Sequence, residues 1–183
     1  MKVLLASASP RRKELLKELI QEFNVETYPT DENFLGETPE ETVKEIALRK
    51  LNAVPNKERY DLIIASDTLV YREGVYYGKP KDHADAVRML TELEGVTHVV
   101  CSGLALYYKG SVESHAVSTL VTFNPMSREQ IEDYLNSYYC LDKAGAYAVQ
   151  DGVVVKSYEG SYTNVVGLPL EKLKEILEEK KII

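Results

Sequence analysis

Apolar positions along the chain fall into two patterns, short continuous runs and a helical spacing of three and four. The strongest strand signal covers 61–71, where an unbroken apolar run is followed by Leu69 and Val70. Further strands are predicted at 2–6, 25–28, 97–108, 112–123 and 152–158. Turn residues at Glu73-Gly74 predict a small hairpin, and those at Lys109-Gly110 predict an antiparallel strand pair.

Helical spacing predicts five helices, at 10–22, 38–54, 82–93, 127–136 and 170–179. The second has the clearest start, with Thr38 as the N-cap, Pro39 in the first turn and Glu41 three residues after the cap. Strands and helices alternate in the first half of the chain, and a strand pair follows. This order predicts an α/β fold with a mixed sheet.

Composition narrows the class of protein. The 183 residues fit one domain with one or two lobes and no linker between independent parts. The net charge of -7 argues against a general nucleic-acid binder, although a local basic pocket for one small anion remains compatible. No run is long enough to span a membrane or to act as a signal peptide. Cys101 and Cys140 are expected to be free thiols in a reducing compartment, which predicts a cytoplasmic protein.

The segment from Ser7 to Arg12 is a candidate phosphate site. A strand ends, small residues turn the chain, and Ser9 and Pro10 open a helix with Arg11 and Arg12 in its first turn. Two cations at a helix N-terminus are unfavourable unless an anion binds there. Serine hydroxyls, free N–H groups and two guanidiniums would hold such an anion. The alternative is a pair of solvated arginines.

Asp67 interrupts an otherwise apolar strand. A buried carboxylate needs a partner, and aspartates at strand ends often bind Mg²⁺. The alternative is that the strand stops at Ser66 and Asp67 caps a turn. Glu32, beside Asp31 in a polar loop, is a candidate second oxygen ligand, although such loop acids are commonly just solvated.

Two lysines and a glutamine complete the candidates. Lys50 lies on the apolar side of the second predicted helix, where it either extends to solvent or points its ammonium into a polar pocket. Lys79 lies in a rigid Gly-Lys-Pro turn and is a candidate for phosphate charge, or else simply exposed. Gln150 carries both donors and an acceptor, enough to recognise a base edge.

Seven stretches occur in an order and spacing that resemble the Maf family, also called septum-formation inhibitor-like proteins. They are LLASASPRRKELL (4–16), GETPEE (36–41), ASDTLV (65–70), GKPKD (78–82), EGVTHVVCSG (94–103), DKAGAYAVQ (142–150) and GSYTNVVGLPL (160–170). The resemblance implies an elongated mixed sheet with helices on both faces, a deep cleft between two lobes, and a homodimer. It implies house-cleaning hydrolysis of a nucleoside triphosphate between the α and β phosphates, with Mg²⁺ or another divalent ion such as Mn²⁺ or Co²⁺.

Family roles carry over position by position. The resemblance implies Asp67 as general base, Glu32 and Asp67 as metal ligands, and Lys50 and Lys79 as further catalytic residues. Its implied substrate-binding residues are Ser7, Ser9, Arg11, Arg12, Thr68 and Gln150. The DKAGAYAVQ stretch is similar to the dTTP/UTP type, which also accepts modified pyrimidine nucleotides. The alternatives are a 7-methyl-GTP pyrophosphatase and a non-catalytic nucleotide-binding regulator of cell division.

The chain departs from the family pattern at three places. Ser66 replaces a more usual alanine beside Asp67. Tyr138-Tyr139-Cys140 replaces a small-acid-proline sequence. Asp151 follows Gln150 where many relatives have glycine.

Overall fold

The computed structural model describes residues 1–183. Seven strands form one sheet in the order β2-β1-β3-β5-β6-β7, with β4 paired to β3 outside this path. The strands are β1 (Val3–Leu5), β2 (Asn24–Val25), β3 (Leu62–Arg72), β4 (Val75–Tyr77), β5 (Thr97–Tyr108), β6 (Ser111–Phe123) and β7 (Val155–Glu159). Because β1 is parallel to β2 and β3 whereas β4 and β7 pair antiparallel, the predicted mixed α/β fold is confirmed.

Six α-helices accompany the sheet: α1 (Pro10–Leu16), α2 (Pro39–Asn52), α3 (His83–Leu93), α4 (Arg128–Ser137), α5 (Tyr162–Val166) and α6 (Leu170–Glu179). Three short 3₁₀ turns are η1 (Lys57–Arg59), η2 (Ala144–Ala146) and η3 (Val149–Asp151). The chain divides into two compact units. The first comprises 1–68, 101–117 and 163–183, and the second comprises 69–100 and 118–162.

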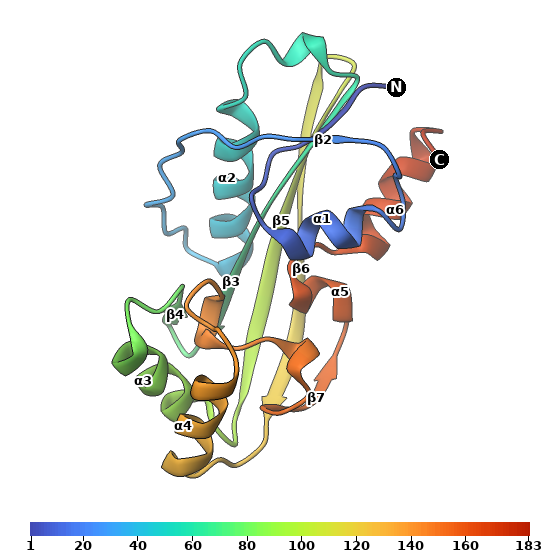
Figure 1. Ribbon diagram of the computed structural model, residues 1–183. Helices are drawn as coiled ribbons and strands as arrows, with labels where there is room; N and C mark the ends of the chain where they lie inside the picture. The colour runs from blue at the N-terminus through green and yellow to red at the C-terminus, as the bar shows by residue number, and fades with distance from the viewer. The chain divides into compact units, whose positions relative to one another are not determined.

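In the first unit, helices cover both faces of the sheet (Figure 1). Successive side chains of a strand point to opposite faces, so Leu62 and Ile64 face one way and Ile63 and Ala65 the other. The first pair packs in a cluster with Leu16 of α1 and with the apolar stripe of α6. The second pair packs with Ala47 and Leu51 of α2. Bonds from Arg12 to Thr68 and from Lys50 to Asp67 place the start of α1 and the end of α2 beside the centre of β3.

In the second unit, α3 packs against α4 and η2 (Figure 1). Its core contains three rings in edge-to-face contact, His98, Phe123 and Tyr147, with centroids 4.6 to 5.5 Å apart. The β3–β4 hairpin turns at Glu73 and Gly74, which have φ of 48° and 82°. Positive φ at both positions is the geometry of a two-residue hairpin turn, as the sequence predicts.

Three predicted elements differ from the structure. α1 ends at Leu16 rather than near residue 22, because the following N–H groups of Glu18 and Leu19 bond to carbonyls three residues back and tighten the chain. β2 is limited to Asn24–Val25, shorter than the predicted 25–28. β7 begins at Val155 rather than at residue 152, and α5 forms at Tyr162–Val166, for which the sequence analysis predicts no element.

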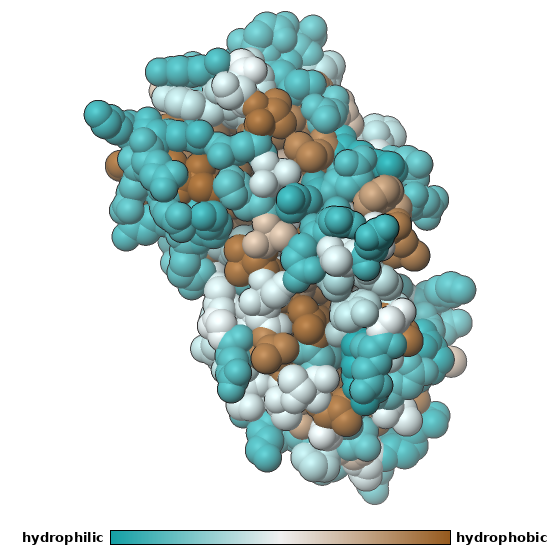
Figure 2. Space-filling view, turned by 180° about the vertical axis from the view of Figure 1, so that it is seen from behind, coloured by the Kyte–Doolittle hydropathy of each residue, from teal (hydrophilic) through white to brown (hydrophobic).

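The surface carries dispersed apolar side chains. On the face seen in Figure 2 they occur in small groups among hydrophilic ones. The exposed apolar residues of the chain include Val153, Tyr158 and Tyr162. Isolated exposed apolar residues are usual in folded proteins. None of the helices combines the length and the apolar character that crossing a bilayer requires.

Gly103 of β5 lets α2 approach the sheet. A Cβ at this position would lie 2.1 Å from the carbonyl oxygen of Val43 in α2, closer than any real contact. The clash is with backbone, so the whole helix would have to move. Gly103 therefore sets how closely α2, which carries Lys50, lies against the strands.

We expect Gly103→Ala to lower the free energy of unfolding by about 3 kcal/mol, because overpacking forces backbone shifts. The urea midpoint measures this. Gly78→Ala is the matched control, since a Cβ there would meet nothing within 4 Å. Equal midpoints for the two variants would contradict the close approach.

Candidate active site

The turn between β1 and α1 is organised by two serines. Ser7 is buried, and its Oγ accepts hydrogen bonds from the backbone N–H of Ser9 (3.2 Å) and from Arg12 Nη1 (3.3 Å). Ser9 is the N-cap of α1, and its Oγ accepts from the N–H of Arg12 at 3.4 Å. The predicted strand–turn–helix is therefore present, although α1 has only seven residues. Its dipole is correspondingly short.

Arg12 joins three segments of the first unit. Its Nε donates to the carbonyl of Gly167 at 2.7 Å and its Nη2 to Thr68 Oγ1 at 3.1 Å, besides the bond to Ser7. The β1–α1 turn, β3 and the turn after α5 thus meet at one guanidinium. The sequence indicates Arg12 as a phosphate ligand but gives no sign of this framework role.

Two further serines belong to this network. Ser102 Oγ lies 2.8 Å from Thr68 Oγ1 and donates to the carbonyl of Asn164 at 3.1 Å. Ser66 Oγ donates to the carbonyl of Gly103 at 2.7 Å. Both serines are fully buried. Sequence reasoning missed Ser102, although a polar residue inside the apolar strand 97–108 was an available signal.

Lys50 of α2 lies between two carboxylates. Its Nζ is 2.7 Å from Asp67 Oδ1 in β3 and 2.6 Å from Glu32 Oε1 in the loop before α2. Lys50 and Asp67 are mostly enclosed, with 19% and 16% of their side chains exposed, whereas Glu32 is 55% exposed. Of the two orientations that the sequence left open, the structure shows the ammonium pointing into a polar pocket. Asp67 lies within β3 and does not end it.

The loop that carries Glu32 is held in place by the neighbouring arginine. Arg49 Nη1 donates to the carbonyl of Asp31 at 3.3 Å, and its guanidinium stacks over the ring of Phe34 at 5.1 Å. The N–H of Asn33 donates to Asp31 Oδ1 at 2.9 Å, which closes a local turn. Consecutive residues of α2 therefore hold both the loop backbone and the Glu32 carboxylate.

Electrostatics link the Arg12 and Lys50 groups. Burial lowers the pKa of Arg12, and the negative charges of Asp67 and Glu32 act in the opposite direction, whereas Arg11 adds to the lowering. These charges lie near enough to act on one another. The first unit therefore gathers three cations and two acids around the middle of β3.

The two acids suit a divalent ion in part. Glu32 and Asp67 offer hard oxygen donors on either side of a bound ammonium, a position that already favours positive charge. No group of three or more potential metal ligands occurs. Mg²⁺ is commonly held by one or two carboxylates with substrate phosphates completing its shell. The donor set fits an ion that binds together with a phosphate ligand.

Lys79 and Gln150 belong to the second unit. Lys79 is exposed in the turn before α3, and the carbonyl of its neighbour Gly78 accepts from the N–H of Gly145 at 3.1 Å. Gly145 has φ of 72° and lies against Val70 and Tyr147. The GKPKD and DKAGAYAVQ stretches are thus joined through backbone. Gln150 is exposed at the centre of η3.

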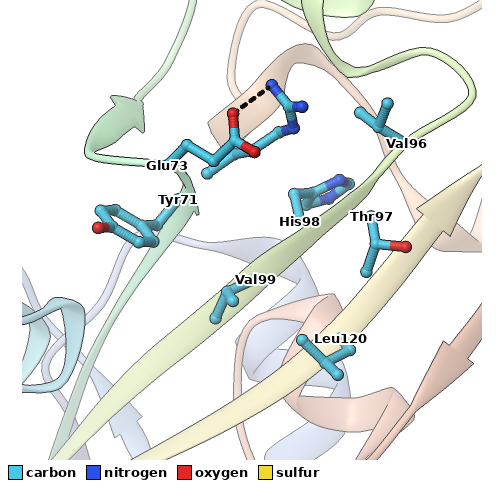
Figure 3. A pocket seen from close by; sticks show the side chains of 8 residues that line it. Tyr71, Glu73, Val96, Thr97, His98, Val99 and Leu120 are labelled. Atoms are coloured by element: carbon cyan, nitrogen blue, oxygen red, sulfur yellow. Dashed lines mark ion pairs between the residues drawn. The ribbon is translucent and has the colours of Figure 1, made fainter.

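The second unit also contains a pocket of about 350 Å³ (Figure 3). It is lined by Tyr71 and Arg72 at the end of β3 and Glu73 after it, by Val96 and residues 97–99 at the start of β5, and by Leu120 of β6. Arg72 and Glu73 form an ion pair of 3.3 Å at its rim. None of the residues predicted for catalysis or binding lines this pocket.

Comparisons with known proteins agree with the motifs. A family model described as Maf-like protein matches residues 2–180. A dTTP/UTP pyrophosphatase of Geotalea uraniireducens is 46% identical over 180 residues, covering 96% of this chain and 93% of that protein. One from Thermotoga maritima is 42% identical, with 98% and 90% covered. One from Clostridium perfringens is also 42% identical, with 100% and 98% covered.

Among solved structures, the Ham1 protein of Staphylococcus aureus has a similar fold. The TM-score is 0.58 at 16% sequence identity, and the match covers 98% of this chain and all of that one. At such low identity the likeness concerns the fold alone.

His98 makes the second unit sensitive to acid. Its Nε2 bonds to the hydroxyl of Tyr147 at 2.8 Å, whereas its Nδ1 is buried without a partner. Burial, together with the charge of Arg72, lowers the pKa of His98 from 6.5 to about 4. The neutral ring is therefore the native form, and the unfolded chain binds the proton first as pH falls.

We expect stability to decrease as pH falls from 6.5 towards 4, by about 3 kcal/mol at most from this group. Urea unfolding at several pH values measures it, and His98→Gln should flatten the dependence. An unchanged slope in His98→Gln would contradict the assignment.

Proposed function

The chain belongs to the Maf family, and we propose that it hydrolyses dTTP and UTP between the α and β phosphates, releasing the monophosphate and pyrophosphate. One observation carries the proposal. Lys50 bridges Asp67 and Glu32, and Arg12 bonds to Thr68, the residue that follows Asp67 in β3. Cations that neutralise a triphosphate and a carboxylate that accepts a proton thus occur together, as hydrolysis requires.

Each residue then has a distinct task. Arg11, Arg12 and Lys50 neutralise negative charge on the phosphates, and the hydroxyls of Ser7, Ser9 and Thr68 support that end of the site. Asp67 acts as general base and takes a proton from the attacking water. Lys50 fixes the Asp67 carboxylate through the bond to Oδ1 and leaves its second oxygen for the water. Lys79 and Gln150, from the second unit, are proposed substrate contacts.

Glu32 and Asp67 would be the protein ligands of a divalent cation. When bound, such an ion would supply positive charge to the phosphate oxygens and acidify water. Glu32 is the more exposed of the two acids and lies on a loop that Arg49 anchors. We further propose that the enzyme works as a cytoplasmic homodimer.

We expect Asp67→Asn to lower kcat about a hundredfold or more, because the amide cannot accept the proton. Pyrophosphate release from dTTP measures this. Asp61→Asn is the matched control, since this exposed carboxylate immediately before β3 bonds only to the start of the chain. Turnover near the wild-type value in Asp67→Asn, with an unchanged unfolding midpoint, would rule out the general base assignment.

A nucleotide panel tests substrate and cofactor together. We expect pyrophosphate release from dTTP and UTP to exceed that from CTP and 7-methyl-GTP about tenfold or more. Chelation with EDTA should stop the reaction, and Mg²⁺ or Mn²⁺ should restore it. Preference for 7-methyl-GTP would replace the substrate assignment. Tight nucleotide binding without pyrophosphate release under every ion would favour a non-catalytic regulator.

A further inference from the structure

One buried hydroxyl forms hydrogen bonds to both ends of the turn that carries Gln150. Tyr134 of α4 is 2% exposed. Its hydroxyl donates to Asp151 Oδ2 at 2.6 Å and accepts from the backbone N–H of Ala148 at 3.1 Å. Ala148 immediately precedes η3 and Asp151 is its last residue. Gln150 therefore lies on a short loop whose two ends are bonded to the same oxygen atom.

The chain before this loop is held by other contacts. Gly145 is bonded to Gly78, and the Tyr147 hydroxyl is bonded to buried His98. Within η3, the N–H of Asp151 bonds to the carbonyl of Ala148 at 3.2 Å, and no side chain caps the turn. A single 3₁₀ turn is weak by itself. The Tyr134 hydroxyl is thus the side chain that fixes the loop from outside.

The bond to Asp151 differs from ordinary packing of a buried tyrosine. A hydroxyl donating to a carboxylate makes a short, charge-assisted bond. Burial raises the pKa of Tyr134, and the bond to Asp151 adds to the rise, so the hydroxyl remains a donor. Burial also raises the pKa of the Cys140 thiol, which keeps it neutral.

The acceptor on the loop is one of the positions at which the sequence departs from the pattern that the resemblance implies. That pattern has a glycine after Gln150, and a glycine at 151 would offer no side-chain acceptor to Tyr134. The Tyr138 ring packs beside that of Tyr134, with centroids 5.2 Å apart.

We propose that Tyr134 is a positioning residue, which acts through Asp151 and Ala148 to hold Gln150 and thereby sets the nucleotide preference. The inference rests on the proposed function, in which Gln150 contacts the substrate. Loosening the loop costs binding and discrimination but leaves the reacting groups of the first unit in place. The effect consequently falls on KM and on the choice of base.

The first test is the kinetics of Tyr134→Phe, which keeps the ring and removes the hydroxyl. We expect KM for dTTP and UTP to rise about tenfold, the effect of losing one good hydrogen bond, with kcat within about twofold. Preference over CTP should fall by a similar factor. Asp151→Ala should reproduce these changes, and Asp151→Asn, which keeps an acceptor oxygen, should restore most of the affinity.

Two comparisons separate positioning from a structural role. Tyr139→Phe is the matched control, because this neighbouring tyrosine is 70% exposed, and it should match the wild type. Tyr134→Phe combined with Gln150→Ala should have the KM of Gln150→Ala alone, since Tyr134 acts through Gln150. A Tyr134→Phe enzyme with lower thermal stability but unchanged KM and base preference would overturn the inference, as would additive effects in the double variant.

Equilibrium binding distinguishes this inference from the proposed function. The α,β-methylene analogue of dTTP cannot be cleaved at the α–β position and reports binding alone. An affinity about tenfold weaker in Tyr134→Phe than in the wild type supports the positioning role, even if the wild type releases no pyrophosphate. Equal affinities would overturn it while leaving the hydrolysis intact. If the wild type binds none of the nucleotides, both proposals fail.

Discussion

The Lys50 ammonium between Asp67 and Glu32 is the interaction on which the first unit depends. Three segments that are distant in sequence supply one group each, and a mostly enclosed lysine would be costly without its acids. The close contact of Gly103 with Val43 places the helix that carries this lysine. Arg12 supports the same region from the other side of β3 through Ser7, Thr68 and Gly167. The contacts that pack the first unit therefore also position its candidate catalytic groups.

Much of the fold was predictable because its signals are local. Apolar runs predicted β3, β5 and β6, and Thr38 caps its helix as expected from the sequence. The end of α1 was not predictable in this way. Apolar residues (Leu19, Ile20 and Phe23) continue the helical spacing beyond residue 16, but tighter turns replace the helix there. Periodicity indicates which side of a segment is buried. It does not indicate whether each N–H bonds to the carbonyl three or four residues back.

The side chains of the candidate site were predictable from the sequence, as the main elements of the fold were. Residue type indicated Asp67 and Lys50 because they are charged groups among apolar positions, and Arg12 because it is a cation at a helix N-terminus. What the sequence did not reveal was the backbone part of the site. The carbonyl of Gly167 accepts from Arg12, and that of Gly103 accepts from Ser66. Every residue has a carbonyl, so no pattern distinguishes these two. Ser66, a departure from the family sequence, is explained only once its buried acceptor is known.

The path of the chain has a consequence for how this protein can have arisen. The polypeptide passes between the two units at residues 68/69, 100/101, 117/118 and 162/163, and the first three passages lie inside β3, β5 and β6. Neither unit corresponds to one continuous stretch of coding sequence. Exchange of a whole unit by genetic recombination would therefore cut strands at several points. Changes in nucleotide preference are accordingly expected to accumulate by single substitutions rather than by exchange of a unit.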